Sequence, residues 1–238
     1  LVRSQMIAFL GNVVAGFAVS LGIFYLLDVV FNIEVLKYSK AYHYWEEVIT
    51  LDWHIFYFGA IAGVFLFLSG LISGMTINSQ RFNNIPERIY HHPILKKTFS
   101  IERRRKISNW FEKNWGGVVG NVAFGFMMGC AFLIGDFTGQ PFDIRHITFV
   151  AGNFAIGIGG MGYHFEIGPM IIGFIAVFMV GWSNFLVSFT FSLLVAMRSN
   201  NIPFYKIFTM ISHTMKAFFR NPLPFFIPPL WTKRKEEA

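Results

Sequence analysis

Long apolar segments recur along this chain and predict helices that cross a membrane. A helix that rises about 1.5 Å per residue needs about 20 mostly apolar residues to cross a hydrocarbon core of about 30 Å. Four segments meet this requirement, at residues 6–30, 55–77, 117–138 and 167–197. The predicted fold is therefore an all-α polytopic membrane protein with four transmembrane helices.

A fifth apolar segment, residues 147–163, is shorter and contains five glycines. We predict a re-entrant or broken segment here, and a fifth true span is the alternative. Non-helical backbone at membrane depth is tolerated only where it is buried in protein or lines a wet cavity. The path of this segment therefore bears on where a site could lie.

The composition agrees with an integral membrane protein. Hydrophobic residues make up 54% of the chain and charged residues only 14%, whereas soluble domains have about 25% charged residues. This balance argues against a soluble nucleic-acid-binding domain, a disordered tail and a disulfide scaffold.

The few charges are clustered, and their signs predict an orientation. Residues 78–116 contain nine Lys/Arg and three Glu, a net charge of +6, and the tail 198–238 has seven Lys/Arg and two Glu, a net charge of +5. Residues 32–53 and 136–166 each have a net charge of −2. Because Lys and Arg accumulate on the cytoplasmic side, both basic stretches should share that side, which requires an even number of crossings between them. We expect four spans in a bacterial inner membrane with both termini of this segment cytoplasmic.

This orientation divides the chain into three parts. Residues 1–200 form the predicted transmembrane domain, and residues 78–116 form a basic cytoplasmic loop within it. Residues 201–238 form a basic amphipathic tail.

A short Gly-Asn motif occurs three times, at Gly11-Asn12, Gly120-Asn121 and Gly152-Asn153, each followed by a further glycine four residues after the Asn. Small residues at this spacing let helices approach closely in lipid, and Asn can hydrogen-bond across the contact. We interpret the motif as a helix-packing device. The alternative is that Asn12, Asn121 and Asn153 line a polar path, since Gly-interrupted apolar segments are typical of transporter binding sites.

The basic flanks predict contacts with lipid headgroups. Arg103, Arg104, Arg105 and Lys106 precede Trp110, Phe111 and Trp115, and aromatic residues of this kind belong at the membrane interface. In the tail, Lys206, Lys216 and Arg220 share one face of a predicted amphipathic helix with Thr209 and His213. We expect membrane lipids, rather than nucleic acid, to be the partner of these cations.

Polar residues near the fifth segment are the candidates for chemistry. Asp143, Arg145 and His146 precede it, and His164 and Glu166 follow it. The favoured interpretation is a salt bridge between Asp143 and Arg145 that anchors an outer loop. If the segment re-enters, His146 and His164 could meet and bind a metal together with the two carboxylates. We expect neither a metal nor a cofactor, and this metal site is the alternative.

Several blocks of the sequence resemble a known family. They are Ile61-Ala62-Gly63-Val64-Phe65-Leu66-Phe67-Leu68-Ser69-Gly70-Leu71-Ile72-Ser73-Gly74, Ile85-Pro86-Glu87-Arg88, and Asp143-Ile144-Arg145-His146-Ile147-Thr148-Phe149 followed by Gly152-Asn153. These blocks resemble the C-terminal part of the bacterial membrane family labelled site-specific recombinase (the gonococcal Gcr type). The resemblance implies an inner-membrane protein with a further N-terminal region, which agrees with a chain that begins at Leu1 only five residues before its first span.

Three hypotheses for function follow. The first is a non-catalytic membrane protein with a role in transport, lipid handling or scaffolding, with membrane lipids, a membrane protein or the missing N-terminal region as partners. The second follows the family label and places DNA recombination at the cytoplasmic loop, near Arg88, Tyr90, His91 and His92. The third is a membrane-embedded metalloenzyme.

Overall fold

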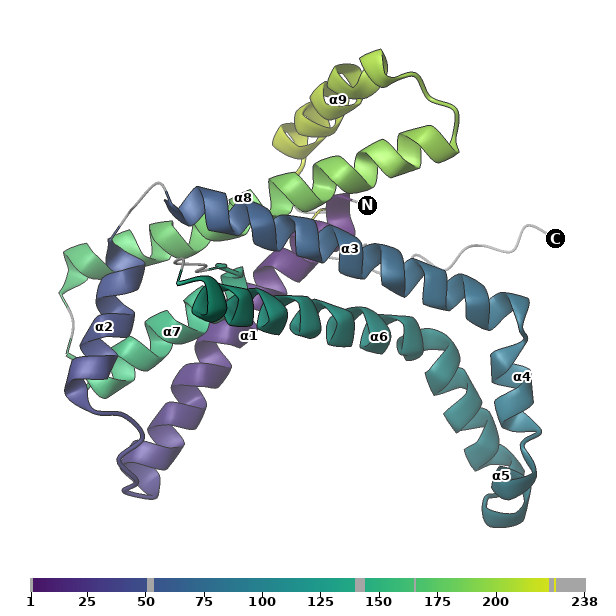
Figure 1. Ribbon diagram of the computed structural model, residues 1–238, viewed down its shortest axis with the longest axis horizontal. Coiled ribbons are helices and arrows are strands. Elements are labelled where there is room, and N and C mark those ends of the chain that lie inside the picture. Colours follow the sequence, from purple (N-terminus) through teal and green to yellow (C-terminus); the bar gives the residue numbers. More distant parts are fainter. Residues whose placement is uncertain (1, 51–53, 140–143, 165, 223–224, 226–238) are drawn as a thin grey trace. The chain divides into compact units, whose positions relative to one another are not determined.

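The computed structural model describes residues 2–50, 54–139, 144–164, 166–222 and 225, and side chains from Met6 onward. Within these residues the chain is helical and has no strand. The helices are α1 (Val2–Tyr25), η1 (Leu26–Val30), α2 (Tyr38–Ile49), α3 (His54–Phe82), α4 (Ile85–Tyr90), α5 (Pro93–Thr98), α6 (Ile101–Thr138), α7 (Ile147–Gly160), α8 (Ile167–Ser199), η2 (Phe204–Lys206) and α9 (Ile207–Arg220) (Figure 1). The chain divides into two compact units, residues 1–63 with 145–238 (unit 1) and residues 64–144 (unit 2).

Four of these helices are long and apolar enough to cross a membrane, which confirms the predicted polytopic fold. They are Met6–Val30, His54–Phe82, Ile101–Thr138 and Ile167–Ser199. Each contains one of the four predicted spans. The basic residues 78–116, predicted as a loop, are largely helical, because they comprise the end of α3, all of α4 and α5, and the start of α6.

The Gly-rich fifth segment forms α7, one continuous helix of 14 residues. At about 1.5 Å per residue it is about 21 Å long, which is shorter than the hydrocarbon core. A re-entrant path for α7 stays a prediction, but the helix itself is not broken.

In unit 1, glycines let three helices pack closely on α7. Added Cβ atoms would lie 2.8 Å from the Thr148 carbonyl oxygen at Gly16, 3.0 Å from Ser20 Oγ at Gly152, and 3.0 Å from the Trp45 backbone nitrogen at Gly157. At Gly173 of α8, an added Cβ would overlap the ring of Phe154. Gly16 and Gly152 belong to two copies of the Gly-Asn motif, so in these two copies the glycine predicted to pack does so.

The core of unit 1 forms around α7 and is apolar and aromatic. Phe154 is fully buried, stacks on Trp45 of α2 with centroids 5.1 Å apart, and meets Phe174 of α8 edge-on at 5.3 Å. Aromatic pairs in these geometries stabilise a core beyond the area that they bury. Phe154 thereby joins α2, α7 and α8 around one ring.

In unit 2, α3 and α6 pack side by side through small residues. An added Cβ at Gly120 would lie 3.0 Å from both the Ser69 carbonyl oxygen and Ser73 Cβ, and one at Gly116 would overlap Ile77. The opposite side of α6 is open, since nothing lies within 4 Å of a Cβ added at Gly117 or Gly125. The backbones of α3 and α6 therefore approach one another on one face of α6 only.

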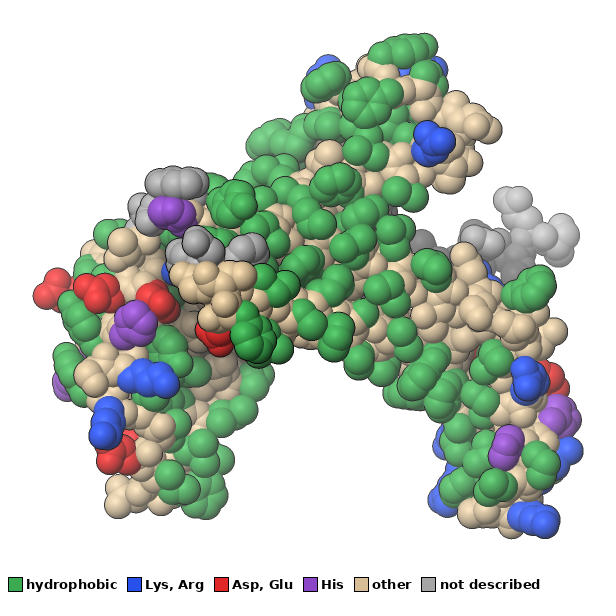
Figure 2. All heavy atoms as spheres, viewed as in Figure 1, with side chains coloured by type: hydrophobic (Ala, Val, Ile, Leu, Met, Phe, Trp, Pro, Cys, Tyr) green, Lys and Arg blue, Asp and Glu red, His purple; other side chains and the backbone are tan. Residues whose placement is uncertain are grey.

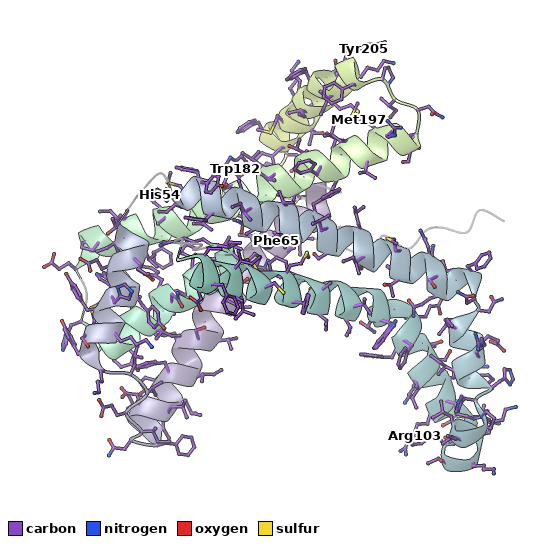
Figure 3. The ribbon with its side chains drawn as sticks, viewed as in Figure 1. His54, Phe65, Arg103, Trp182, Met197 and Tyr205 are labelled. Carbon is purple, nitrogen blue, oxygen red and sulfur yellow. The ribbon has the colours of Figure 1, made fainter. Side chains whose placement is uncertain are left out.

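At the end of unit 1, the chain turns back from α8 into α9. Ile207 of α9 is buried against Leu193 and Met197 of α8, and Met197 and Tyr205 are labelled near this turn in Figure 3. Phe208 and Phe219 are 77% and 74% exposed. The predicted amphipathic helix is thus present, and part of its apolar surface remains uncovered by the described residues.

The one-sided packing of α6 predicts opposite results for two glycine substitutions. Gly120→Leu should lower the stability of the protein in detergent by about 1–3 kcal/mol, because the side chain must enter an occupied helix contact. Gly125→Leu, on the open side of the same helix, should be neutral or slightly stabilising because leucine is the better helix former. Thermal unfolding of the two variants checks this, and equal destabilisation would contradict the described α3–α6 contact.

Candidate functional site

The cations of the basic region gather at one end of unit 2. Figure 2 shows Lys and Arg side chains over α5 and the adjacent end of α6, and Figure 3 labels Arg103 there. Ser100 begins α6 as its N-cap, and its Oγ accepts a hydrogen bond from the Arg103 backbone N–H at 3.4 Å. This cap fixes where the helix starts and therefore the face on which each following cation lies.

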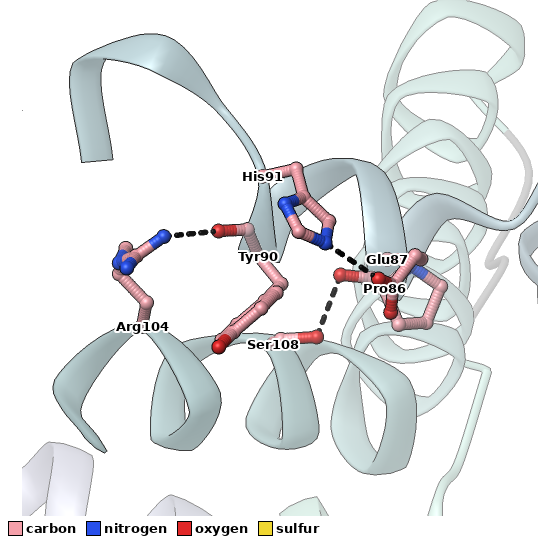
Figure 4. A network of polar contacts seen from close by, with 6 residues as sticks. All are labelled: Pro86, Glu87, Tyr90, His91, Arg104 and Ser108. Atoms are coloured by element: carbon pink, nitrogen blue, oxygen red, sulfur yellow. Dashed lines mark hydrogen bonds and ion pairs between the residues drawn. The ribbon is translucent and has the colours of Figure 1, made fainter. Parts of the chain in front are cut away.

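Polar contacts attach α4 to the first turns of α6 (Figure 4). Ser108 Oγ donates a hydrogen bond of 2.6 Å to the Pro86 carbonyl oxygen, and Arg104 Nη1 donates one of 3.1 Å to the Tyr90 carbonyl oxygen. The Arg104 guanidinium carbon also lies 5.0 Å from the centre of the Tyr90 ring, within the range of a cation–π contact. Arg104 therefore holds α4 in place, a role that its position in a run of cations did not predict.

The neighbouring cations are more open. Arg103, Arg105 and Lys106 are exposed, whereas Arg104 is half-buried. Arg103 lies 5.8 Å from the centre of the Phe99 ring. Four of the seven residues predicted to bind lipid headgroups lie in this run, and Arg103, Arg105 and Lys106 present their charge at the surface.

Two tryptophans and a phenylalanine follow the cations on α6. Phe111 packs on Trp115 with centroids 5.0 Å apart and on Trp110 at 5.5 Å. Trp110 is 49% exposed and Trp115 is 37% exposed. Cations followed within three turns by half-exposed tryptophans are typical of a helix that passes through the membrane interface.

Unit 1 contains a buried polar joint that the sequence analysis missed. Asn184, in the middle of α8 and 2% exposed, donates from Nδ2 to the Gly59 carbonyl oxygen at 2.7 Å and to the Arg145 carbonyl oxygen at 3.1 Å. Its Oδ1 accepts from the Ile147 backbone N–H at 3.0 Å. One amide thus connects α3, α8 and the start of α7, and the signal in the sequence was a Ser-Asn pair in an otherwise apolar span.

His146 completes the start of α7. It is the N-cap residue, and its Nδ1 accepts a hydrogen bond from the Thr148 backbone N–H at 3.4 Å. Only 5% of its surface is exposed, and this burial lowers its pKa to about 4. The imidazole is therefore neutral at pH 7 and can accept the capping hydrogen bond.

Arg145 lies beside a small polar pocket in unit 1. Its Nη1 donates to the Glu47 carbonyl oxygen at 3.0 Å, which attaches it to the end of α2. The pocket has a volume of about 270 Å³ and includes side chains of His43, Glu46, Glu47 and His54. Within the described parts of the chain, no group of three or more His, Cys, Asp or Glu side chains has the arrangement of a metal site.

The other candidates for chemistry do not come together with His146. His164 and Glu166 are exposed and follow the C-terminal end of α7, whereas His146 is buried at its start. A continuous helix of about 21 Å separates the two histidines, so the structure does not join them at one site. Asp143 lies outside the described residues, and its predicted salt bridge with Arg145 stays a prediction.

The three motif asparagines differ in exposure. Asn12 of α1 and Asn153 of α7 are half-buried, and Asn121 of α6 is exposed. Their shared polar path stays a prediction. The tail cations Lys206, Lys216 and Arg220 are all exposed on or next to α9.

These features define the protein as a multi-pass helical membrane protein with a buried polar joint in unit 1 and a cationic, aromatic-flanked end in unit 2. Comparison of the sequence with family models places residues 1–228 in a family described as site-specific recombinase. The chain belongs to this family, as the resemblance predicted. No curated protein and no solved structure matches the chain.

The three hydrogen bonds of Asn184 predict a specific loss of stability. Asn184→Leu keeps the volume but leaves the Ile147 N–H and two carbonyl oxygens without this partner, which should cost about 1–3 kcal/mol. Ser188→Ala is the matched control on the same helix, because Ser188 is equally buried but its Oγ donates only within α8, to the Phe185 carbonyl oxygen. Thermal unfolding in detergent should separate the two variants, and an unchanged Asn184→Leu variant would contradict the joint.

The lowered pKa of His146 predicts a stability that depends on pH. Between about pH 4 and pH 6.5, His146 is protonated in the unfolded state but remains neutral in the folded state. The free energy of unfolding should therefore fall as the pH drops through this window. The slope due to this residue is at most about 1.4 kcal/mol per pH unit. His146→Asn retains an N-cap side chain without the titrating group, and its unfolding temperature should fall less with pH than that of the wild type. Parallel pH profiles would show that His146 is not the group responsible.

Proposed function

We propose that this protein is a non-catalytic membrane protein that handles lipid, and that it binds anionic phospholipids at the cationic end of unit 2. The observation that carries the proposal is the placement of Arg103, Arg105 and Lys106. These cations are exposed on the first turns of α6, directly before Trp110 and Trp115, on a helix that continues as a candidate membrane span.

The physical basis is electrostatic attraction close to a surface. A Lys or Arg near an anionic leaflet contributes about 1 kcal/mol of binding free energy. The tryptophans favour the headgroup level through their amphipathic rings. Together they would keep the cations within reach of lipid phosphates.

The tail supports the same role. The exposed cations of α9 accompany the exposed apolar side chains of Phe208 and Phe219. A helix with these two faces suits the plane of the interface. In this proposal the membrane is a bacterial inner membrane, and the basic stretches and both termini of this segment face the cytoplasm.

DNA recombination, which the family description names, is the alternative. Of the residues suggested for it, Tyr90 lies beneath the Arg104 guanidinium and His91 Nε2 pairs with Glu87 Oε1 at 2.7 Å. The contact of Tyr90 with Arg104 packs α4 on α6, whereas the pair of His91 with Glu87 lies within α4 and its C-cap. Both Tyr90 and His91 are thus engaged in local contacts, which favours lipid handling over strand exchange. Transport and scaffolding are further roles for the same kind of protein.

The proposal predicts a loss of anionic lipid on neutralising the exposed cations. The triple variant Arg103→Gln, Arg105→Gln, Lys106→Gln should bind phosphatidylglycerol at least about tenfold more weakly than the wild type, since each cation contributes about 1 kcal/mol. Native mass spectrometry of the full chain in micelles of mixed phosphatidylglycerol and phosphatidylcholine would measure the bound lipid. Arg104 stays in place because it holds Tyr90.

A second cation-removing variant controls for net charge. Lys37→Gln with Lys40→Gln removes two exposed cations next to and within α2, and should leave the binding of phosphatidylglycerol unchanged. Duplex DNA added to the wild type tests the alternative by fluorescence anisotropy. Tight, salt-dependent binding of DNA without enrichment of anionic lipid would overturn the proposal.

A further inference from the structure

A pocket opens between α3, α4 and α6 of unit 2, and its α6 residues, Phe111 and Trp115, follow the cations of that helix. Its volume is about 540 Å³, within the range of sites that hold small ligands. Its walls include Ile72, Met75, Ser79 and Gln80 of α3, and Phe111 and Trp115 of α6. The pocket lies wholly within unit 2.

The wall of the pocket changes from apolar to polar along α3. On α3, Ile72 and Met75 line one end, Ser79 and Gln80 line the other, and Thr76 lies between them. Ile72 and Gln80 are about 12 Å apart along the helix axis. The polar end is the one nearer the end of α3 and the cationic start of α6. A membrane lipid has the same order of an apolar chain and a polar headgroup.

Gln80 provides a buried acceptor at the polar end. Its side chain is 5% exposed, and Nε2 donates a hydrogen bond of 3.1 Å to the Phe111 carbonyl oxygen. With the amide oriented by this bond, Oε1 is left buried and accepts no hydrogen bond from the described residues. A buried polar oxygen in this state costs free energy, so a ligand that donates a hydrogen bond there would be stabilised.

We propose that this pocket holds one phospholipid of the phosphatidylglycerol class. Its acyl chain lies along Ile72 and Met75 next to Trp115. A headgroup hydroxyl donates a hydrogen bond to Gln80 Oε1 after the side chains that cover this oxygen shift aside. The choice of an anionic lipid follows from the net charge of +6 on residues 78–116. The choice of a hydroxyl follows from Gln80, since phosphatidylcholine offers no hydrogen-bond donor. This inference rests on the proposed function in that the bilayer around unit 2 supplies the lipid.

Two lipids of equal charge test the hydrogen bond. Phosphatidylmethanol is anionic like phosphatidylglycerol but lacks the headgroup hydroxyls. Native mass spectrometry of the full chain should show one tightly held phosphatidylglycerol, bound about two- to tenfold more strongly than phosphatidylmethanol, as expected for one hydrogen bond. In Gln80→Met this preference should disappear, and equal binding of both lipids by the wild type would overturn the role of Gln80.

A pocket-filling variant tests the location. Ser79→Phe places a ring in the pocket without removing Gln80 and should displace the tightly held lipid. Asn78→Phe is the matched control at the adjacent exposed position, which does not line the pocket. Phosphatidylglycerol with a brominated acyl chain should quench tryptophan fluorescence more in the wild type than in Trp115→Phe, because Trp115 lines the pocket. Retention of the lipid by a folded Ser79→Phe variant, or identical quenching in the two proteins, would overturn the proposal.

The two proposals fail separately in these experiments. If the triple cation variant loses phosphatidylglycerol while Ser79→Phe binds like the wild type, surface binding stands and the pocket is wrong. If a single lipid is displaced by Ser79→Phe but the triple variant binds like the wild type, the pocket stands and surface binding is wrong. Thermal unfolding of each variant shows that a loss of lipid is not a loss of fold, and Gln80→Met tests the site without adding bulk.

Discussion

The buried start of α7 is the constraint on which unit 1 depends. A helix that begins inside a protein leaves its first backbone N–H groups without partners in the helix, and in an apolar environment each such group costs several kcal/mol unless it is satisfied. Here Ile147 donates to Asn184 and Thr148 donates to His146. Asn184 also donates a hydrogen bond to the Gly59 carbonyl oxygen of α3. The side chain that satisfies the start of α7 therefore also fixes the positions of α3, α7 and α8 relative to one another.

The hydrogen bonds of Asn184 require α3 and α8 to lie close together, and glycines of α3 allow this close approach. A Cβ at Gly63 would lie 2.8 Å from the Asn184 carbonyl oxygen, and one at Gly59 would lie 3.1 Å from Ser183 Cβ. Lipid chains give apolar helices little reason to associate, so association depends on van der Waals contact and interhelical hydrogen bonds. The glycines of α3 bring the Asn184 amide within hydrogen-bond distance of the Gly59 carbonyl oxygen. Close packing and the interhelical hydrogen bond therefore stabilise the same contact between α3 and α8.

The sequence predicted the parts of the structure that depend on one helix at a time. Of those that depend on two helices, it predicted the close contacts of motif glycines but missed the hydrogen bonds between helices. Runs of apolar residues sufficed for the four spans, because each span is set by bilayer thickness. The Gly-Asn motif led to close contacts at Gly16 and Gly120, but the asparagine that joins helices is Asn184, which has no glycine beside it. An amide in an apolar span signals a partner, and only the fold identifies that partner. Likewise α4 and α5 begin at or next to Pro86 and Pro93, a favoured start for helices, within a stretch whose charge suggested a loop.

The distribution of polar groups also bears on what such a protein can do. In unit 1 the buried amide of Asn184 and the imidazole Nδ1 of His146 are engaged in holding helices, so chemistry at these groups would compete with the fold. In unit 2, by contrast, several polar groups are not used to hold helices together. Arg105 and Lys106 are exposed, and Gln80 Oε1 accepts no hydrogen bond from the described residues. The helix α6 has 38 residues and a length of about 57 Å, well beyond the hydrocarbon core. The helix is therefore long enough for its charged first turns to extend beyond the hydrocarbon core while the remainder crosses it, as the proposed binding of phospholipid headgroups requires.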